Sequence, residues 1–258
     1  MRISLDVRKT PEQNAAEYYE KAKKAKKKLE GARKALDASR RKLEALQKAQ
    51  AAEQQKKKEA PKQEKKWYEK LRWFTSSEGF LVIGGKDATS NEIVIKKHTD
   101  ANDIVFHTDM AGSPFFVIKT EGKIPGEATM QETAQATASY SRAWRAGLGL
   151  LEVFHVAPEQ VSKTARAGEY MGKGAFMIYG KTNYVSAELR LAVGVTNEGR
   201  VMGGPPQAVK ANCAKYAEVV PGRDKTSDAA KRILKRIGGD LDSIIAALPA
   251  GGCSVRNK

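Results

Sequence analysis

Cysteine and histidine are scarce in this chain of 258 residues, which contains two cysteines and three histidines. Cys213 and Cys253 form no Cys-x-x-Cys pair and have no histidine cluster beside them, so the sequence predicts no metal site and no cofactor. A chain of this length can bury a sizeable core and does not require a disulfide. We therefore expect two ordinary thiols.

Long apolar runs are also missing. No segment approaches the roughly 20 apolar residues that a membrane-spanning helix needs. The first ten residues, MRISLDVRKT, lack the apolar core of a secretory signal. The sequence therefore predicts a cytoplasmic protein that makes no contact with a membrane.

Positive charge, in contrast, is abundant and unevenly distributed. The net charge is +16. Residues 1–66 carry 21 Lys and Arg against 10 Asp and Glu, a net charge of +11, which leaves +5 for the remaining 192 residues. A polyanion is therefore the first partner to consider, and most of the excess charge lies on one N-terminal segment.

This basic segment has the pattern of a coiled-coil helix. Its composition from Glu12 onward is rich in Ala, Glu, Lys and Leu, with Thr10 as the expected N-cap and Pro11 at the first helical position. Apolar or small residues recur at alternating intervals of three and four, which is the a/d pattern: Ala15, Tyr18, Ala22, Ala25, Leu29, Ala32, Leu36, Ser39, Leu43 and Leu46. We expect a basic coiled-coil arm over residues 1–60, about 65 Å long if the helix runs to residue 55. Its many lysines are either solvated or in contact with a polyanion.

The rest of the chain mixes strands and helices. Short β-rich runs over residues 80–83, 92–96, 103–106 and 115–119 predict an antiparallel meander. A helix over 129–147 is expected from a Thr129-x-x-Glu132 capping box and from Gly147 at its end. Further strands are expected over 150–156, 175–179, 189–195 and 200–202, and further helices over 206–215 and 227–237. This order predicts an α+β fold, a largely antiparallel sheet with covering helices, over residues 61–240, followed by a tail over 241–258.

Two motifs invite a catalytic interpretation. Gly84-Gly85-Lys86 does not match a P-loop, because the glycines are adjacent and a strand is expected to follow. His107 and Asp109 follow a strand and share one side of it by the period of two, so they are either structural or an acid–base pair. No third ligand or nucleophile lies near them in the sequence, so we expect no catalytic residue and no enzymatic activity. The alternative is an RNA-processing or RNA-modifying enzyme that uses His107 and Asp109.

Cations mixed with amides and aromatic rings recur in residues 66–97 and 160–185. Gly-rich loops let backbone N–H groups approach phosphates, while aromatic rings stack on bases. The run that contains Trp67, Tyr68, Trp73 and Phe74 suits either stacking on bases or docking a helix on the sheet. The expected RNA-binding residues are Lys66, Arg72, Lys86, Asn91, Lys96, Lys97, His107, Lys163, Arg166, Lys173, Lys181, Asn183 and Tyr184.

Three stretches are similar to a known family: KWYEKLRWFTSSEGFLVIGGKDATSNEIVIKK, DIVFHTDMAGSPFFVIK and PEQVSKTARAGEYMGKGAFMIYGKTNY. They resemble the NFACT family of ribosome-associated quality-control proteins, specifically its RNA-binding module, NFACT-R, preceded by a coiled-coil arm, over about residues 12–240. The resemblance implies that residues 61–240 are the NFACT-R domain. It also implies binding to rRNA of the large ribosomal subunit, to tRNA and to ribosomal proteins, in complexes that hold a stalled nascent chain on peptidyl-tRNA.

Full-length members of the family also extend the nascent chain with C-terminal tails. Residues implicated in that synthesis lie in an NFACT-N domain, whereas this sequence starts at the entry to the arm. The resemblance therefore implies either a fragment of a longer protein or a short form that binds without elongating. A remaining alternative is a scaffold whose coiled coil pairs with itself or with another chain.

Overall fold

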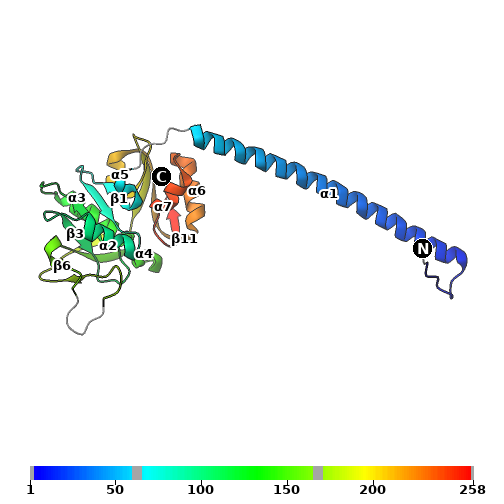
Figure 1. Cartoon of the computed structure of the whole chain (residues 1–258), viewed down its shortest axis with the longest axis horizontal. Coiled ribbons are helices and arrows are strands. Elements are labelled where there is room, and N and C mark those ends of the chain that lie inside the picture. The colour runs from blue at the N-terminus through cyan, green and yellow to red at the C-terminus, as the bar shows by residue number, and fades with distance from the viewer. Residues whose placement is uncertain (1–2, 60–65, 165–170, 257–258) are drawn as a thin grey trace. The chain divides into compact units, whose positions relative to one another are not determined.

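The computed structural model describes residues 3–59, 66–164 and 171–256, over 49–59 by the backbone alone. The chain divides into two units, Met1–Glu64 and Lys65–Lys258 (Figure 1). The predicted α+β class is confirmed. No helix in the described ranges is long and apolar enough to cross a membrane.

The first unit contains the long helix α1 (Pro11–Glu59). Thr10 caps it as predicted: its hydroxyl accepts a hydrogen bond from the Gln13 backbone N–H, and the Gln13 side chain accepts one from the Thr10 N–H. The buried Asn14 amide donates to the carbonyl oxygens of Asp6 and Thr10, each at 3.1 Å, and fixes the residues before the helix. The large residues of the expected a/d seam, such as Leu29, are exposed.

The second unit is built on a six-stranded antiparallel sheet. Its spatial order is β1-β2-β4-β3-β5-β8. The strands are β1 (Arg72–Thr75), β2 (Leu81–Gly84), β3 (Ile104–His107), β4 (Phe116–Lys119), β5 (Leu150–Val156) and β8 (Asn183–Glu188). The order differs from a meander because β4 lies between β2 and β3.

A four-stranded antiparallel sheet packs against the first. Its order is β10-β9-β11-β12, with β9 (Leu191–Thr196), β10 (Val201–Gly204), β11 (Cys213–Asp224) and β12 (Cys253–Val255). The helices α5 (Pro206–Asn212), α6 (Thr226–Ile237) and α7 (Leu241–Ala247) lie beside it (Figure 1). Residues 241–255, expected as a tail, thus supply a helix and a strand to this layer, because β12 pairs with β11. A two-stranded hairpin of β6 (Val161–Ser162) and β7 (Met177–Ile178) completes the sheets that are described.

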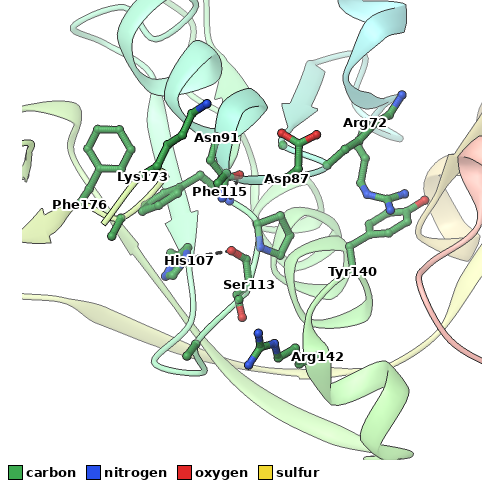
Figure 2. Close-up of a pocket in the computed structure, with 18 residues that line it drawn as sticks. Arg72, Asp87, Asn91, His107, Ser113, Phe115, Tyr140, Arg142, Lys173 and Phe176 are labelled. Carbon is green, nitrogen blue, oxygen red and sulfur yellow. Dashed lines mark hydrogen bonds between the residues drawn. The ribbon is translucent and has the colours of Figure 1, made fainter. Parts of the chain in front are cut away.

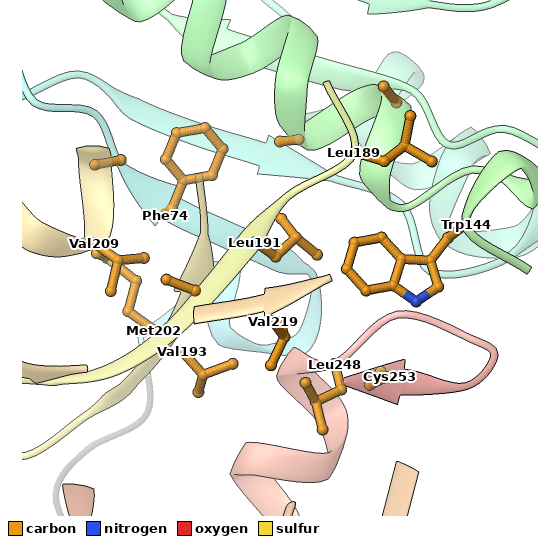
Figure 3. Packing of buried hydrophobic residues seen from close by; sticks show 14 of the residues in the cluster. Phe74, Trp144, Leu189, Leu191, Val193, Met202, Val209, Val219, Leu248 and Cys253 are labelled. Atoms are coloured by element: carbon orange, nitrogen blue, oxygen red, sulfur yellow. The ribbon is translucent and has the colours of Figure 1, made fainter. Parts of the chain in front are cut away.

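The two sheets share the main hydrophobic core. Phe74 from β1, Leu191 from β9 and Met202 from β10 are buried together (Figure 3). Trp144 closes one end of this core, and its indole N–H donates to the Gly252 carbonyl oxygen at 3.0 Å. Alternate residues of β4 serve two cores: Phe116 faces this cluster, whereas Val117 faces a second one on the opposite side of the sheet. Both faces of the central strands are therefore buried.

Helix α2 (Ala88–Lys97) covers the second face, and the predicted strand over 92–96 is wrong. The Asp87 carboxylate accepts a hydrogen bond from the Ser90 N–H at 2.8 Å, and the Ser90 hydroxyl accepts from the Asp87 N–H. Asn91 and Val94 are buried on one face, at helical spacing. This cap and the packing of Val94 against the sheet outweigh the β preference of the Ile-Val-Ile run.

The predicted helix over 129–147 is two helices, α3 (Glu127–Ser139) and α4 (Arg142–Ala146). The Thr129 capping box is wrong, because α3 begins before it and Glu78 from a distant turn accepts a hydrogen bond from the Thr129 N–H at 2.9 Å. Ser141 caps α4, and Gly147 ends it in the left-handed conformation, as predicted. The aromatic run at 67–74 forms the 3-10 helix η1 (Trp67–Lys70) followed by β1, and a second 3-10 turn, η2 (Pro158–Gln160), precedes β6.

Candidate nucleic-acid interface

A pocket with a cavity volume of about 460 Å³ opens where β1, the N-terminus of α2, the end of β3 and three loops meet (Figure 2). We call it the cationic pocket, because four of its lining residues are basic and one is acidic. The basic residues are Arg72, Lys86, Arg142 and Lys173, and the acidic residue is Asp87. The other lining residues are Gly85, Ala88, Asn91, His107, Ala111, Gly112, Ser113, Pro114, Phe115, Tyr140, Gly174, Ala175 and Phe176.

Arg72 is fixed in one orientation. Its guanidinium lies 3.9 Å from the centre of the Tyr140 ring, and it donates to the Leu248 carbonyl oxygen at 3.4 Å. The Tyr140 hydroxyl in turn donates to the Ala247 carbonyl oxygen at 2.7 Å. These partners hold a charge of fixed position at one wall of the pocket.

Lys86 lies close enough to Arg72 for the two charges to interact. Partial burial lowers the pKa of Lys86, and the positive charge of Arg72 lowers it further. Hydrogen bonds from Ser90 lower the pKa of Asp87, so this carboxylate stays ionised and is occupied in capping α2. An anion that entered the pocket would relieve the repulsion between the two cations.

The floor of the pocket depends on a close approach of two backbones. The Asn91 side-chain oxygen accepts a hydrogen bond from the Phe115 N–H at 3.2 Å, and the Gly85 N–H donates to the Phe115 carbonyl oxygen at 3.0 Å. A Cβ at position 85 would lie 1.9 Å from the Asn91 oxygen, so only glycine fits there. Gly85 therefore allows α2 to pack closely against the segment that precedes β4.

One side of the pocket is held by Glu92 and Lys163. The Glu92 carboxylate accepts from the Lys163 ammonium at 2.9 Å and from the Gly174 N–H at 3.1 Å. These bonds lower the pKa of Glu92 to about 2. Lys163 also donates to the carbonyl oxygens of Gly172 and Ala175. Lys163 therefore positions the loop that carries Lys173. Its ammonium group is already bonded to these protein partners.

His107 lines the pocket as a neutral ring. It stacks on Phe115 with centroids 4.0 Å apart, and its Nε2 lies 3.2 Å from the Ser113 carbonyl oxygen (Figure 2). Burial lowers the pKa of His107. Asp109 has a separate partner, since its carboxylate accepts a hydrogen bond from the Tyr184 hydroxyl at 3.0 Å. The nearby Asp109 charge acts against this lowering of the His107 pKa, and the acid–base pair stays an alternative that nothing in this geometry tests.

The structure thus brings five of the predicted RNA-binding residues together in the cationic pocket: Arg72, Lys86, Asn91, His107 and Lys173. Lys163 holds the loop at one side of the pocket, and the other predicted residues are not among those that line it. Lys96 and Lys97 are at the far end of α2, while Lys181, Asn183 and Tyr184 are exposed at or before β8. Lys66 precedes η1, beside Trp67, whose exposed ring stacks on His98 at 4.2 Å. Arg166 lies outside the described residues.

Sequence reasoning missed Arg142, Tyr140 and Phe176 as pocket residues. Arg142 reaches the pocket because Ser141 starts a new helix there, and the two serines around Tyr140 were the available signal for that break. Tyr140 and Arg72 meet across 68 positions of sequence, which no local pattern indicates.

In the described part of the chain, no group of three or more His, Cys, Asp or Glu side chains could hold a metal ion. Cys213 and Cys253 are buried and free, and burial raises the pKa of each.

Residues 70–180 match the family described as NFACT protein RNA binding domain. All of this chain aligns, at 44% identity over 269 positions, with the archaeal Rqc2 homolog aRqcH of Methanocaldococcus jannaschii, of which it spans 40%. The ribosome quality control complex subunit NEMF of Homo sapiens is 43% identical over 121 residues, which cover 46% of this chain and 11% of that protein. The NEMF homolog of Drosophila melanogaster is 42% identical over 121 residues, which cover 46% of this chain and 12% of that protein.

The chain therefore spans less than half the length of these relatives. The match to the family's domain includes the whole segment that lines the cationic pocket, since it begins before Arg72 and ends after Phe176. With an RNA-binding module of this kind and similarity to aRqcH along its full length, the chain belongs to the NFACT family.

Proposed function

We propose that this chain binds RNA, either rRNA of the large ribosomal subunit or tRNA, in ribosome-associated quality control in the cytoplasm, with ribosomal proteins as further partners. It acts by binding rather than by catalysis. The observation that supports this function is the cationic pocket, which is lined by four basic side chains and one acidic one. The acidic side chain, Asp87, is already hydrogen-bonded to the Ser90 N–H. Phosphate is the anion that such a cluster suits in an RNA-binding domain.

The proposal extends to residues outside the pocket. The exposed Lys96, Lys97, Lys181 and Asn183 would add weaker contacts to phosphates, and Tyr184 and Trp67 offer partly exposed rings. Lys66 is exposed, with its ammonium group 5.9 Å from the centre of the Tyr68 ring, and would add a further contact. Arg166 lies outside the described residues and stays a prediction from the sequence. Lys163 and His107 would contribute to the shape of the site rather than bind phosphate directly. The Lys163 ammonium group is already bonded to Glu92 and Gly172, and the His107 ring is neutral.

The test is cosedimentation of the chain with free large subunits and with intact ribosomes, over a series of salt concentrations. We expect binding that falls steeply with salt, because released counterions drive contacts to phosphate. The Lys86→Glu/Lys173→Glu variant should bind at least about tenfold more weakly. Lys123→Glu is the matched control, since Lys123 is exposed in the loop after β4, beyond the opposite end of that strand from Phe115. Equal binding by all three proteins at every salt concentration would refute the proposal.

A coiled-coil partner for α1 is a second candidate function, supported by a specific observation. Leu29, Leu36 and Leu43 recur at intervals of seven and are 54%, 55% and 57% exposed. Such a seam is stabilised when another helix covers it. We expect Leu36→Asp to abolish association of the full chain in sedimentation velocity experiments, if α1 pairs with itself. A chain that is monomeric with and without the substitution would leave another protein as the partner to be sought.

A further inference from the structure

We propose that the cationic pocket takes one unpaired nucleotide of the bound RNA, so that this domain prefers single-stranded segments to duplex. The inference rests on the proposed RNA-binding function and specifies its ligand. It assigns the phosphate to the basic rim and the base to the apolar interior.

The size and shape of the pocket support a single nucleotide. Its volume of about 460 Å³ lies within the range of about 300–1,000 Å³ that small-molecule sites occupy. A duplex presents its phosphates along a continuous surface and keeps its bases paired. Contacts to a duplex therefore need cations spread along an open face, whereas here Lys86, Arg142 and Lys173 surround a hollow.

The lining has the two chemistries that a nucleotide needs. Besides the cations, the lining contains the apolar groups Ala88, Ala111, Pro114, Ala175 and Phe176. A bare phosphate would gain nothing from these walls, whereas a base would bury its faces against them. The guanidinium of Arg72, which already lies against one aromatic ring, is a further flat surface at the wall.

The pocket is also built in advance of binding. Asn91 ties α2 to the segment before β4, and Glu92 with Lys163 ties α2 to the loop that carries Lys173. The loop from Met110 to Ser113 is closed by hydrogen bonds, in which the Ser113 hydroxyl donates to the Met110 carbonyl oxygen at 2.8 Å. Because these walls are fixed, binding of a nucleotide requires little further ordering of the protein.

The first experiment compares RNAs with the unmodified chain. Fluorescence anisotropy is measured with a single-stranded 12-mer, with the blunt duplex of the same sequence, and with a hairpin that carries an unpaired loop, all at one salt concentration. We expect the single strand and the hairpin to bind at least about tenfold more tightly than the duplex, from burial of one base. Equal affinities for the strand and the duplex would overturn the inference.

The second experiment fills the pocket without changing its charge. The Ala111→Leu/Ala175→Leu variant places apolar groups in the hollow and keeps every cation, whereas Ala101→Leu is a control at an exposed position beyond the far end of α2. We expect the filled variant to lose about tenfold in affinity for the single strand and nothing for the duplex. Unchanged affinity for the strand, in a variant with the circular dichroism spectrum of the parent, would count against an inserted base.

These outcomes separate the inference from the function on which it rests. If the chain binds strand and duplex equally and only Lys86→Glu/Lys173→Glu weakens both, RNA binding stands and the inserted nucleotide does not. If no RNA binds at low salt, the proposed function itself fails. A nucleoside 5′-monophosphate, added as a competitor, should displace the strand only at millimolar concentration. Displacement at micromolar concentration would assign the pocket to a free mononucleotide and overturn the RNA assignment.

Discussion

The glycine at position 85 offers a quantitative test of how the cationic pocket is held together. In Gly85→Ala, the new Cβ would lie 1.9 Å from the Asn91 side-chain oxygen and 3.0 Å from the Asn91 backbone nitrogen. The backbone nitrogen belongs to α2 and cannot move alone, so the side chain must leave. That movement leaves the buried Phe115 N–H without its hydrogen-bond acceptor, which lowers the free energy of unfolding by about 1–3 kcal/mol. Crowding adds about 1–3 kcal/mol more.

The expected loss of stability is thus roughly 2–6 kcal/mol. A loss of about 4 kcal/mol in a unit of this size lowers the Tm by about 8–16 °C, which differential scanning calorimetry measures directly. Gly149→Ala is the control, because nothing lies within 4 Å of its Cβ position; its Tm should stay within about 3 °C of the parent.

A double-mutant cycle identifies the clash. Asn91→Ala removes both the hydrogen bond and the obstructing oxygen, so adding Gly85→Ala to it should cost much less than Gly85→Ala alone. A Tm of Gly85→Ala within about 1 °C of the parent, or simple additivity of the two substitutions, would show that Asn91 does not clash with a side chain at position 85.

Three further substitutions probe other parts of the account. Lys86→Glu/Lys173→Glu should reduce the slope of log affinity against log salt by about 0.7 for each phosphate of single-stranded RNA that a lysine no longer neutralises, and an unchanged slope would remove both lysines from the interface. Glu92 has its pKa lowered to about 2, so its pairing with Lys163 stabilises the fold above the ordinary pKa of 4.5 and is lost as pH falls toward 2. Glu92→Gln should therefore show a smaller loss of Tm between pH 7 and pH 3 than the parent, and identical pH profiles would contradict this. Phe74→Ala, at a fully buried position shared by both sheets, should cost about 3–5 kcal/mol in urea unfolding, and a loss below about 1 kcal/mol would show that the core is not shared as described.

Local patterns predicted the features that local interactions determine. The start of α1 follows from Thr10 and Pro11, which act within one turn, and the end of α4 follows from a glycine that adopts the left-handed conformation. The β-branched residues of α2 suit a strand as well as a helix, so their pattern predicted the wrong element. The Asp87 and Ser90 cap was the signal that could have corrected it.

Other features depend on interactions between distant positions, which no local pattern could supply. The N-terminus of α3 is capped by Glu78, 51 positions away from Thr129. The pocket joins Arg72 to Tyr140, and Glu92 to Gly174, through the order of the strands. Several cationic residues that the sequence singled out line the pocket, but no neighbouring residue distinguishes Lys163, whose ammonium group is paired with Glu92, from Lys173, which is exposed.

The central claim is that RNA is bound at the cationic pocket. The most direct measurement is cross-linking of the full chain to single-stranded RNA that contains 4-thiouridine, followed by mass spectrometry of the linked peptides. We predict links within residues 107–115 and 172–176, which carry the aromatic and apolar walls. Links confined to the C-terminal layer, residues 223–256, would contradict the claim and place the RNA on another face of the domain.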